Sequence, residues 1–123
     1  MLQDATIHVY LPASNLARAR AFYERVLGLT PKEEYAGGVF YECGGAMAFL
    51  YPTPNAGTSK ASQAFWAVAD VEAEVADLKA RGVVFEDYGM PGQDADGIVI
   101  QGGARAAWFR DSEGNILAVI QGA

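Results

Sequence analysis

Polar and apolar residues follow a strand pattern near the start of the chain and a helical pattern directly after it. Residues 5–11 are β-branched and aromatic and alternate between two faces, which is typical of a strand. Residues 16–27 place apolar side chains at spacings of three and four, which is typical of an amphipathic helix. Asn15 is a favourable cap for that helix, and Gly28 ends it.

The second half of the chain repeats this arrangement. The pattern predicts a strand at 63–69 and a helix over 71–81, with Asp70 as its cap and Gly82 as its end. A repeat of this kind predicts two similar structural modules within one chain.

The repeat also pairs two polar side chains. His8 is the only histidine and lies seven residues before Asn15, while Gln63 lies seven residues before Asp70. Equivalent strand positions in the two halves therefore carry His8 and Gln63, which suggests that both side chains face one shared pocket.

Shorter strands complete each half. The expected strands of the first half, separated by glycine pairs, are 31–36, 38–43 and 46–51. Those of the second half are 83–87, 106–110 and 116–120, with a possible short strand at 98–100 inside a glycine-rich loop, 88–104, which could be a lid.

The order βαβββ, found twice, predicts an α+β fold. Two βαβββ modules form a curved mixed sheet around a cleft, with helices on the outer face. The modules are expected at 1–52 and 62–123, joined by a linker rich in Pro, Gly and Ser, within a single domain over 1–123.

Composition excludes several function classes. The chain has 123 residues, with 15 acidic and nine basic residues and a net charge of −6. No basic stripe is available for nucleic acid or anionic membranes. No secretion signal or membrane-spanning run is expected. One cysteine, Cys43, excludes an internal disulfide and fits a cytoplasmic location.

These segments resemble a known family. The doubled βαβββ pattern, the segment 15–29 and the hairpin 108–117 resemble the vicinal oxygen chelate superfamily. Its members include glyoxalase I, extradiol dioxygenases, fosfomycin-resistance transferases and bleomycin-resistance binding proteins. The resemblance covers essentially the whole chain and implies the fold, but this scaffold hosts unrelated activities. It also implies a homodimer, and in some relatives the cleft is built from halves of two chains.

The resemblance implies four positions for metal ligands. Metal-dependent members hold them on the first and last strand of each half, which here are His8, Phe49, Gln63 and Ala118. Phe49 and Ala118 cannot bind a metal, and a catalytic divalent metal typically needs three or more protein ligands. We therefore expect no metal cofactor, although His8 and Gln63 leave a divalent metal possible.

Strand alternation predicts which residues line the cleft. From the positions above, the ligand-binding residues are expected to be His8, Tyr10, Met47, Phe49, Tyr51, Gln63, Phe65 and Ala118. Such a surface is aromatic with a few polar groups, which suits a flat apolar or aromatic ligand. The alternative is that these aromatic rings fill the cleft or form a dimer contact.

Catalytic candidates are few. Glu42 is the one carboxylate inside a central apolar strand, and together with His8 it is a weak candidate for acid–base chemistry. On an edge strand it would simply be solvated.

Three functions remain open from the sequence. The first is a metal-independent protein that binds a small molecule. The second is a metal-dependent lyase, isomerase or dioxygenase of glyoxalase type with atypical ligands, and the third is a structural or regulatory dimer with a filled cleft.

Overall fold

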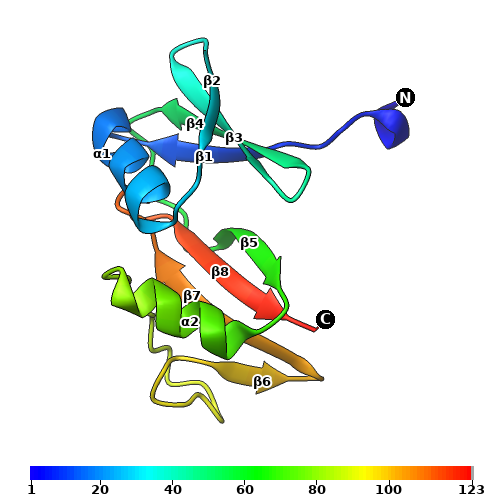
Figure 1. Ribbon diagram of the computed structural model, residues 1–123, viewed down its shortest axis with the longest axis vertical. Helices are drawn as coiled ribbons and strands as arrows, with labels where there is room; N and C mark the ends of the chain where they lie inside the picture. The colour runs from blue at the N-terminus through cyan, green and yellow to red at the C-terminus, as the bar shows by residue number, and fades with distance from the viewer. Residues whose placement is uncertain (123) are drawn as a thin grey trace.

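The computed structural model describes residues 1–122 and contains two four-stranded mixed sheets (Figure 1). The strand orders are β1-β4-β3-β2 and β5-β8-β7-β6, so the two halves have equivalent topology. The first sheet consists of β1 (Val9–Ala13), β2 (Pro31–Tyr35), β3 (Gly38–Cys43) and β4 (Ala46–Pro52). The second consists of β5 (Ser62–Val68), β6 (Val99–Gln101), β7 (Ala104–Arg110) and β8 (Ile116–Gln121). This arrangement confirms the predicted α+β class.

One helical segment follows the first strand of each half. In the first half, α1 (Leu16–Ala21) continues as a π-helical turn, η2 (Phe22–Val26), and a short 3₁₀ turn, η1 (Leu2–Asp4), precedes β1. In the second half, α2 (Val71–Ala80) packs on the sheet. No helix of the described residues is long and apolar enough to cross a membrane.

The caps form as the sequence predicts. The Asn15 side chain accepts a hydrogen bond from the Arg18 backbone N–H at 3.0 Å, and Asp70 accepts one from Ala73 at 3.1 Å. Each cap satisfies a backbone donor that the first helical turn would leave free.

Two predicted strands differ from the structure. The segment 83–87 makes only an isolated bridge, Phe85 to Phe109, and the second strand of that half is instead β6. The first strand is shifted toward the C-terminus and ends at Ala13 rather than at residue 11. Because β1 is an edge strand of its sheet, it tolerates Pro12, which has no N–H to donate.

The shift of β1 leaves the preceding segment outside the sheet. The N-terminal arm, residues 1–8, projects from the body of the molecule in Figure 1. Ile7, which alternation predicts to be packed under the helices, is 89% exposed. That prediction is wrong because strand pairing begins only at Val9.

The helix-facing sides of both sheets form one core. Leu11 and Leu50 of the first sheet and Leu117 and Val119 of the second are buried in the same cluster. Ala64, Trp66 and Val68 pack against it, as alternation along β5 predicts. The opposite faces of the sheets lie outside this core and offer surfaces for a ligand.

A buried polar turn joins the two halves. The turn between β7 and β8 contains Asp111, Glu113 and Asn115, which are at most 7% exposed. Asn115 donates from its side-chain amide to the carbonyl of Pro12 at 2.7 Å, and Asp111 accepts a 2.5 Å hydrogen bond from the Tyr23 hydroxyl. These contacts anchor the second module to β1 and to the helical segment of the first.

Glu113 binds to the start of α1. Its carboxylate accepts hydrogen bonds from the backbone N–H of Asn15 at 2.8 Å, the Arg18 guanidinium at 2.8 Å and the Ser14 hydroxyl at 3.2 Å. Burial alone would raise the pKa of Glu113, but these bonds and one from Ser112 outweigh it and lower the pKa to about 2. The carboxylate is therefore charged at neutral pH and fixed between the two modules.

Candidate functional site

Six ring side chains gather on the face of the first sheet that points away from the helices. We call this surface the aromatic face, and it consists of His8, Tyr10, Tyr35, Phe40, Phe49 and Tyr51. Phe49 is at its centre, with ring centroids 4.6 Å from Phe40, 6.1 Å from Tyr10 and 6.4 Å from Tyr51. Strand register explains the grouping, because Phe49 pairs with Tyr10 on one side and with Phe40 on the other.

Much of the aromatic face is open. Tyr10 is 68% exposed and Tyr35 is 62% exposed, while Phe49 is half-buried. A hollow of about 180 Å³ lies against His8, Tyr10, Tyr35 and Phe49. An exposed cluster of rings of this extent is unusual on a surface that contacts only water.

Gly38 makes room for the central ring. A Cβ atom at this position would lie 2.7 Å from the Phe49 ring and 2.3 Å from the backbone oxygen of Leu50. Only glycine therefore lets β3 approach β4 closely enough for Phe49 to keep its position.

The equivalent face of the second sheet is smaller and mixed. Phe65 pairs with Ala118, which pairs with Trp108 on β7. Phe65 is 58% exposed, whereas Ala118 is buried. Tyr88, from the loop that follows α2, contacts Trp108 edge-on with ring centroids 6.0 Å apart.

Gln63 precedes Phe65 on β5 and carries an unsatisfied group. Its side-chain oxygen is buried and has no hydrogen-bond partner among the described residues. Such an atom is costly to leave unpaired, so it is available to accept a hydrogen bond from a ligand or a second chain.

A second cavity lies between the edge strands β1 and β5. It measures about 380 Å³ and is lined mainly by apolar side chains and backbone of both modules. Met47 reaches it from the first sheet and Phe65 from the second, and Cys43 also lines it. Met47 and Phe65 are both predicted site residues, and they line this one cavity although they come from different modules.

The predicted residues therefore fall into two groups. His8, Tyr10, Phe49 and Tyr51 share the aromatic face of the first sheet. Gln63, Phe65 and Ala118 lie on the second sheet, and His8 lines a different hollow from Phe65.

These side chains do not suit a divalent metal. His8 and Gln63 are the only donors at the four family positions and lie on different modules, with His8 exposed ahead of β1. Within residues 1–122, no group of three or more His, Cys, Asp or Glu side chains could hold a metal ion. Two neutral donors without a carboxylate give a metal neither charge balance nor a sufficient coordination number.

Glu42 lies toward the rim of the first sheet, opposite Met47 in the strand register. Its side chain is half exposed and forms an ion pair with Lys32 at 2.9 Å. The Glu42 carboxylate accepts a hydrogen bond from the Lys32 ammonium group and raises the pKa of Lys32. A solvated carboxylate held by lysine is poorly suited to be a general base.

Two features are not foreseen from the sequence. Tyr35 joins the aromatic face because it pairs with Gly38 of β3, which brings its ring to within 6.0 Å of the Phe40 ring, centroid to centroid. The polar turn 111–115 is expected from the sequence only as part of the hairpin 108–117, yet it is buried and joins the modules. Three polar side chains at alternate positions between two apolar strands are the signal that marks it.

The doubled topology, together with the hollows beside its two sheets, is that of a two-module α+β protein of glyoxalase type. The model of the glyoxalase/bleomycin resistance protein/dioxygenase superfamily matches residues 6–119, and the chain belongs to this superfamily. Comparison with curated proteins gives no match.

Solved structures share the fold. A glyoxalase family protein from Bacillus anthracis has a TM-score of 0.77 at 17% identity, covering 98% of this chain and 96% of its own. TnmS3, an antibiotic binding protein from Streptomyces sp. CB03234, has a TM-score of 0.77 at 21% identity, covering 100% and 99%. The fosfomycin resistance protein FosX from Listeria monocytogenes, complexed with Mn(II) and sulfate ion, has a TM-score of 0.73 at 15% identity, covering 98% and 91%.

Proposed function

We propose that this protein is a metal-independent binding protein for a flat apolar or aromatic small molecule. The observation that carries the proposal is the aromatic face, where rings surround Phe49 and Tyr10 and Tyr35 stay largely exposed. Planar ligands gain from offset or edge-on contact with such rings beyond the burial of area alone. The family likeness to TnmS3, an antibiotic binding protein, supports the same class of function.

We also propose that two copies of the chain complete the site. The aromatic face belongs to one module, whereas the unsatisfied oxygen of Gln63 and the exposed ring of Phe65 belong to the other. Within one chain these groups do not line a common cavity with Tyr10 and Phe49. A homodimer in which each first sheet faces the partner's second sheet supplies the ligand with rings on one side and a hydrogen-bond acceptor on the other. A cytoplasmic location remains a prediction from the single cysteine.

Calorimetric titration with planar two- and three-ring compounds, such as naphthol and acridine, tests the binding function. Tyr10→Ala should weaken binding about threefold to tenfold, because it removes one ring contact without opening the core. Val84→Ala is the matched control, since Val84 is 83% exposed and is not part of the aromatic face. Absence of binding across the panel would favour a structural or regulatory dimer with a filled cleft.

Elemental analysis separates this proposal from a metal-dependent lyase, isomerase or dioxygenase. We expect purified protein to carry no stoichiometric divalent metal and to bind the aromatic probe equally well with and without a chelator. Stoichiometric metal that is lost in His8→Ala would contradict the proposal.

A further inference from the structure

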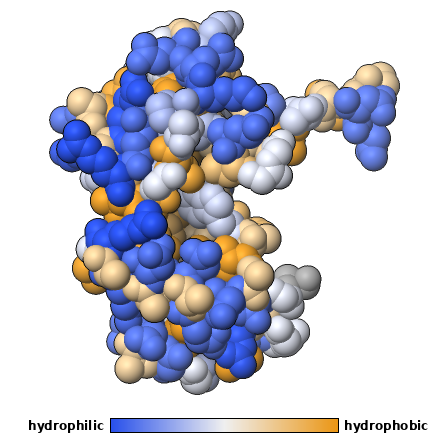
Figure 2. Space-filling view, viewed as in Figure 1, coloured by the Kyte–Doolittle hydropathy of each residue, from blue (hydrophilic) through white to orange (hydrophobic). Residues whose placement is uncertain are grey.

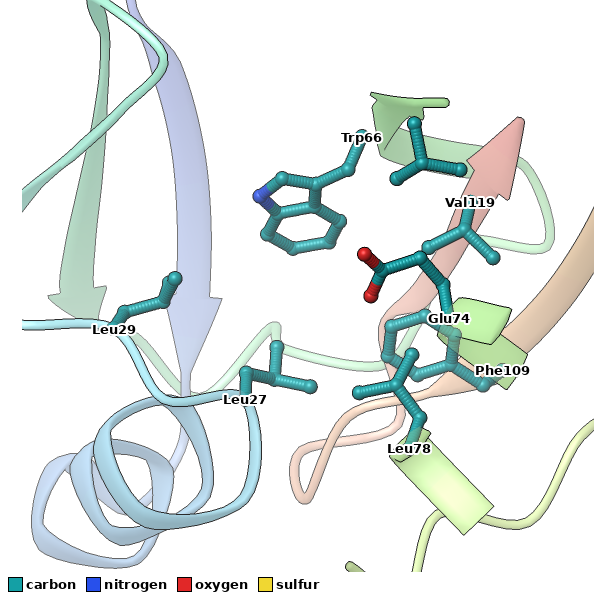
Figure 3. Close-up of a pocket in the computed structure, with 8 residues that line it drawn as sticks. Leu27, Leu29, Trp66, Glu74, Leu78, Phe109 and Val119 are labelled. Atoms are coloured by element: carbon teal, nitrogen blue, oxygen red, sulfur yellow. The ribbon is translucent and has the colours of Figure 1, made fainter. Parts of the chain in front are cut away.

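A separate groove lies on the helix side of the second sheet, at the junction of the two modules (Figure 3). The sheet supplies Trp66 and Phe109, whose rings stack with centroids 6.4 Å apart at 20°. Leu78 of α2 forms one side, and Leu27 and Leu29 of the first module form the other. In the space-filling view, hydrophobic surface is visible at the waist between the two lobes (Figure 2).

The first module shapes its side of the groove through the π-helical turn. The backbone N–H of Leu27 donates to Phe22 at 3.0 Å, and that of Leu29 donates to Tyr23 at 2.9 Å. Gly28, between them, has a positive φ of 76°, which lets the chain reverse after the helix. Both leucines are thereby held at the seam opposite α2.

One charged side chain belongs to this apolar groove. The carboxylate of Glu74 on α2 points into the space between Trp66 and Leu27 (Figure 3). The other acidic residues within α2 have partners, because Glu72 pairs with Arg105 and Asp77 pairs with Arg81 at 3.3 Å.

Glu74 itself makes no ion pair with any of residues 1–122. An unpartnered carboxylate beside an aromatic ring attracts a cation, since both the charge and the negative face of the indole favour it. The net charge of −6 also favours a cationic ligand.

The size of the groove limits the ligand. Its volume is about 170 Å³. Cavities of roughly 150 Å³ with apolar walls hold benzene. One ring or a branched aliphatic group therefore fits the groove.

We propose that this groove is a second binding site, distinct from the aromatic face, for a compact ammonium ion that carries one apolar ring or branched chain. The ammonium group binds the Glu74 carboxylate, and the apolar group packs between Trp66 and the leucines of the first module. The ligand bridges the two modules and so favours their present arrangement.

Nuclear magnetic resonance with benzylammonium as the probe tests the site. The indole N–H signal of Trp66 reports on the groove and on the adjoining cavity between β1 and β5, which Trp66 also lines, so the Glu74 variant below assigns the shift to the groove. The signal of Trp108, which pairs with Ala118, reports on the opposite face of the same sheet. We expect a saturable shift of the Trp66 signal only, with a Kd of roughly 1–10 mM for a ligand this small. Benzyl alcohol, which has the same shape without the charge, should bind about threefold to tenfold more weakly.

Two variants with the same change of charge identify the acidic group. Glu74→Gln should remove the preference for benzylammonium over benzyl alcohol, and Glu72→Gln should keep it. The proposal is overturned if the Trp66 signal does not move at about 50 mM probe, or if the alcohol binds as tightly as the ammonium ion. It is also overturned if both variants lose the preference equally, since the cation would then respond only to overall charge.

Discussion

At the scale of single residues, Glu113 shows how a charge can be buried between modules. Its side chain is fully covered, and Arg18, which is half exposed, lies 2.8 Å away. Backbone and hydroxyl donors of residues 14 and 15 satisfy the remaining oxygen lone pairs. Because the folded chain already holds these donors in place, the ionised form of Glu113 is the stable one. Protonation of this carboxylate should therefore destabilise the fold.

This arrangement predicts a specific loss of stability in acid. The folded pKa of about 2 lies below the ordinary value of 4.5, so the folded protein binds fewer protons than the unfolded chain. The stabilisation is present above about pH 4.5 and is lost as pH falls toward 2. Between pH 6 and 2.5, the free energy of unfolding of wild type should fall about 2–3 kcal/mol more than that of Glu113→Gln. Urea denaturation across this range measures the difference.

An exposed carboxylate provides the control for this titration. Glu33 is exposed and makes no ion pair with any of residues 1–122, so Glu33→Gln should follow the wild-type curve. Parallel curves for wild type and Glu113→Gln would show that the buried charge adds nothing to stability.

Sequence alone predicts part of the aromatic face and misses the rest for a physical reason. Tyr10, Phe49 and Tyr51 share a face because regular strands alternate with a period of two. Tyr35 reaches this face because β2 pairs in regular register with β3 there, with Glu33 opposite Phe40 and Tyr35 opposite Gly38, and this cross-strand pairing is not visible in the pattern of a single strand. The partners of Glu113 lie more than ninety positions away in sequence, so no local pattern contains them.

At the scale of elements, local signals predict the helices better than the strands. Asn15 and Asp70 fix both helix starts, since capping needs only neighbouring residues. The segment 83–87 has strand composition, yet it makes only one bridge, to Phe109. The edge of the second sheet next to β7 is formed by β6 instead. Strand pairing depends on distant partners, and composition does not contain this information.

Removing either cap should cost a similar amount of stability. Asn15→Ala and Asp70→Ala should each lower the free energy of unfolding by about 1 kcal/mol. Asn15→Ala keeps the backbone N–H that donates to Glu113, so only the cap is lost. The caps belong to different helices, and the double variant should lose the sum within about 0.5 kcal/mol.

Chemical denaturation of the three variants measures these losses. Thr6→Ala, on the exposed arm, is the control that should change nothing. A double variant that loses no more than one single variant would show that the two helices do not contribute independently.

At the scale of the whole molecule, the core is covered while one face of each sheet stays open. The helices and the buried turn 111–115 join the two modules on one side. On the other side, Tyr10 and Phe65 remain more than half exposed. Sequence predicts the doubled topology from its repeat, but it leaves open whether the two open faces meet within one chain. The structure places their residues on separate sheets, which is the physical basis for proposing a second copy.

A dimer formed through these faces should respond to both mutation and salt. Light scattering after size-exclusion chromatography should give about twice the chain mass of 13.1 kDa. Phe65→Ser should shift the protein toward monomer, because it replaces an apolar ring in the proposed contact by a hydroxyl, whereas the equally drastic Val84→Ser should not. Each chain carries a charge of −6, so repulsion opposes association, and raising NaCl from about 0.05 to 0.5 M should tighten the dimer by screening it. A wild-type protein that stays monomeric at high concentration in both salts would contradict the shared site and would leave the aromatic face to bind its ligand within a single chain.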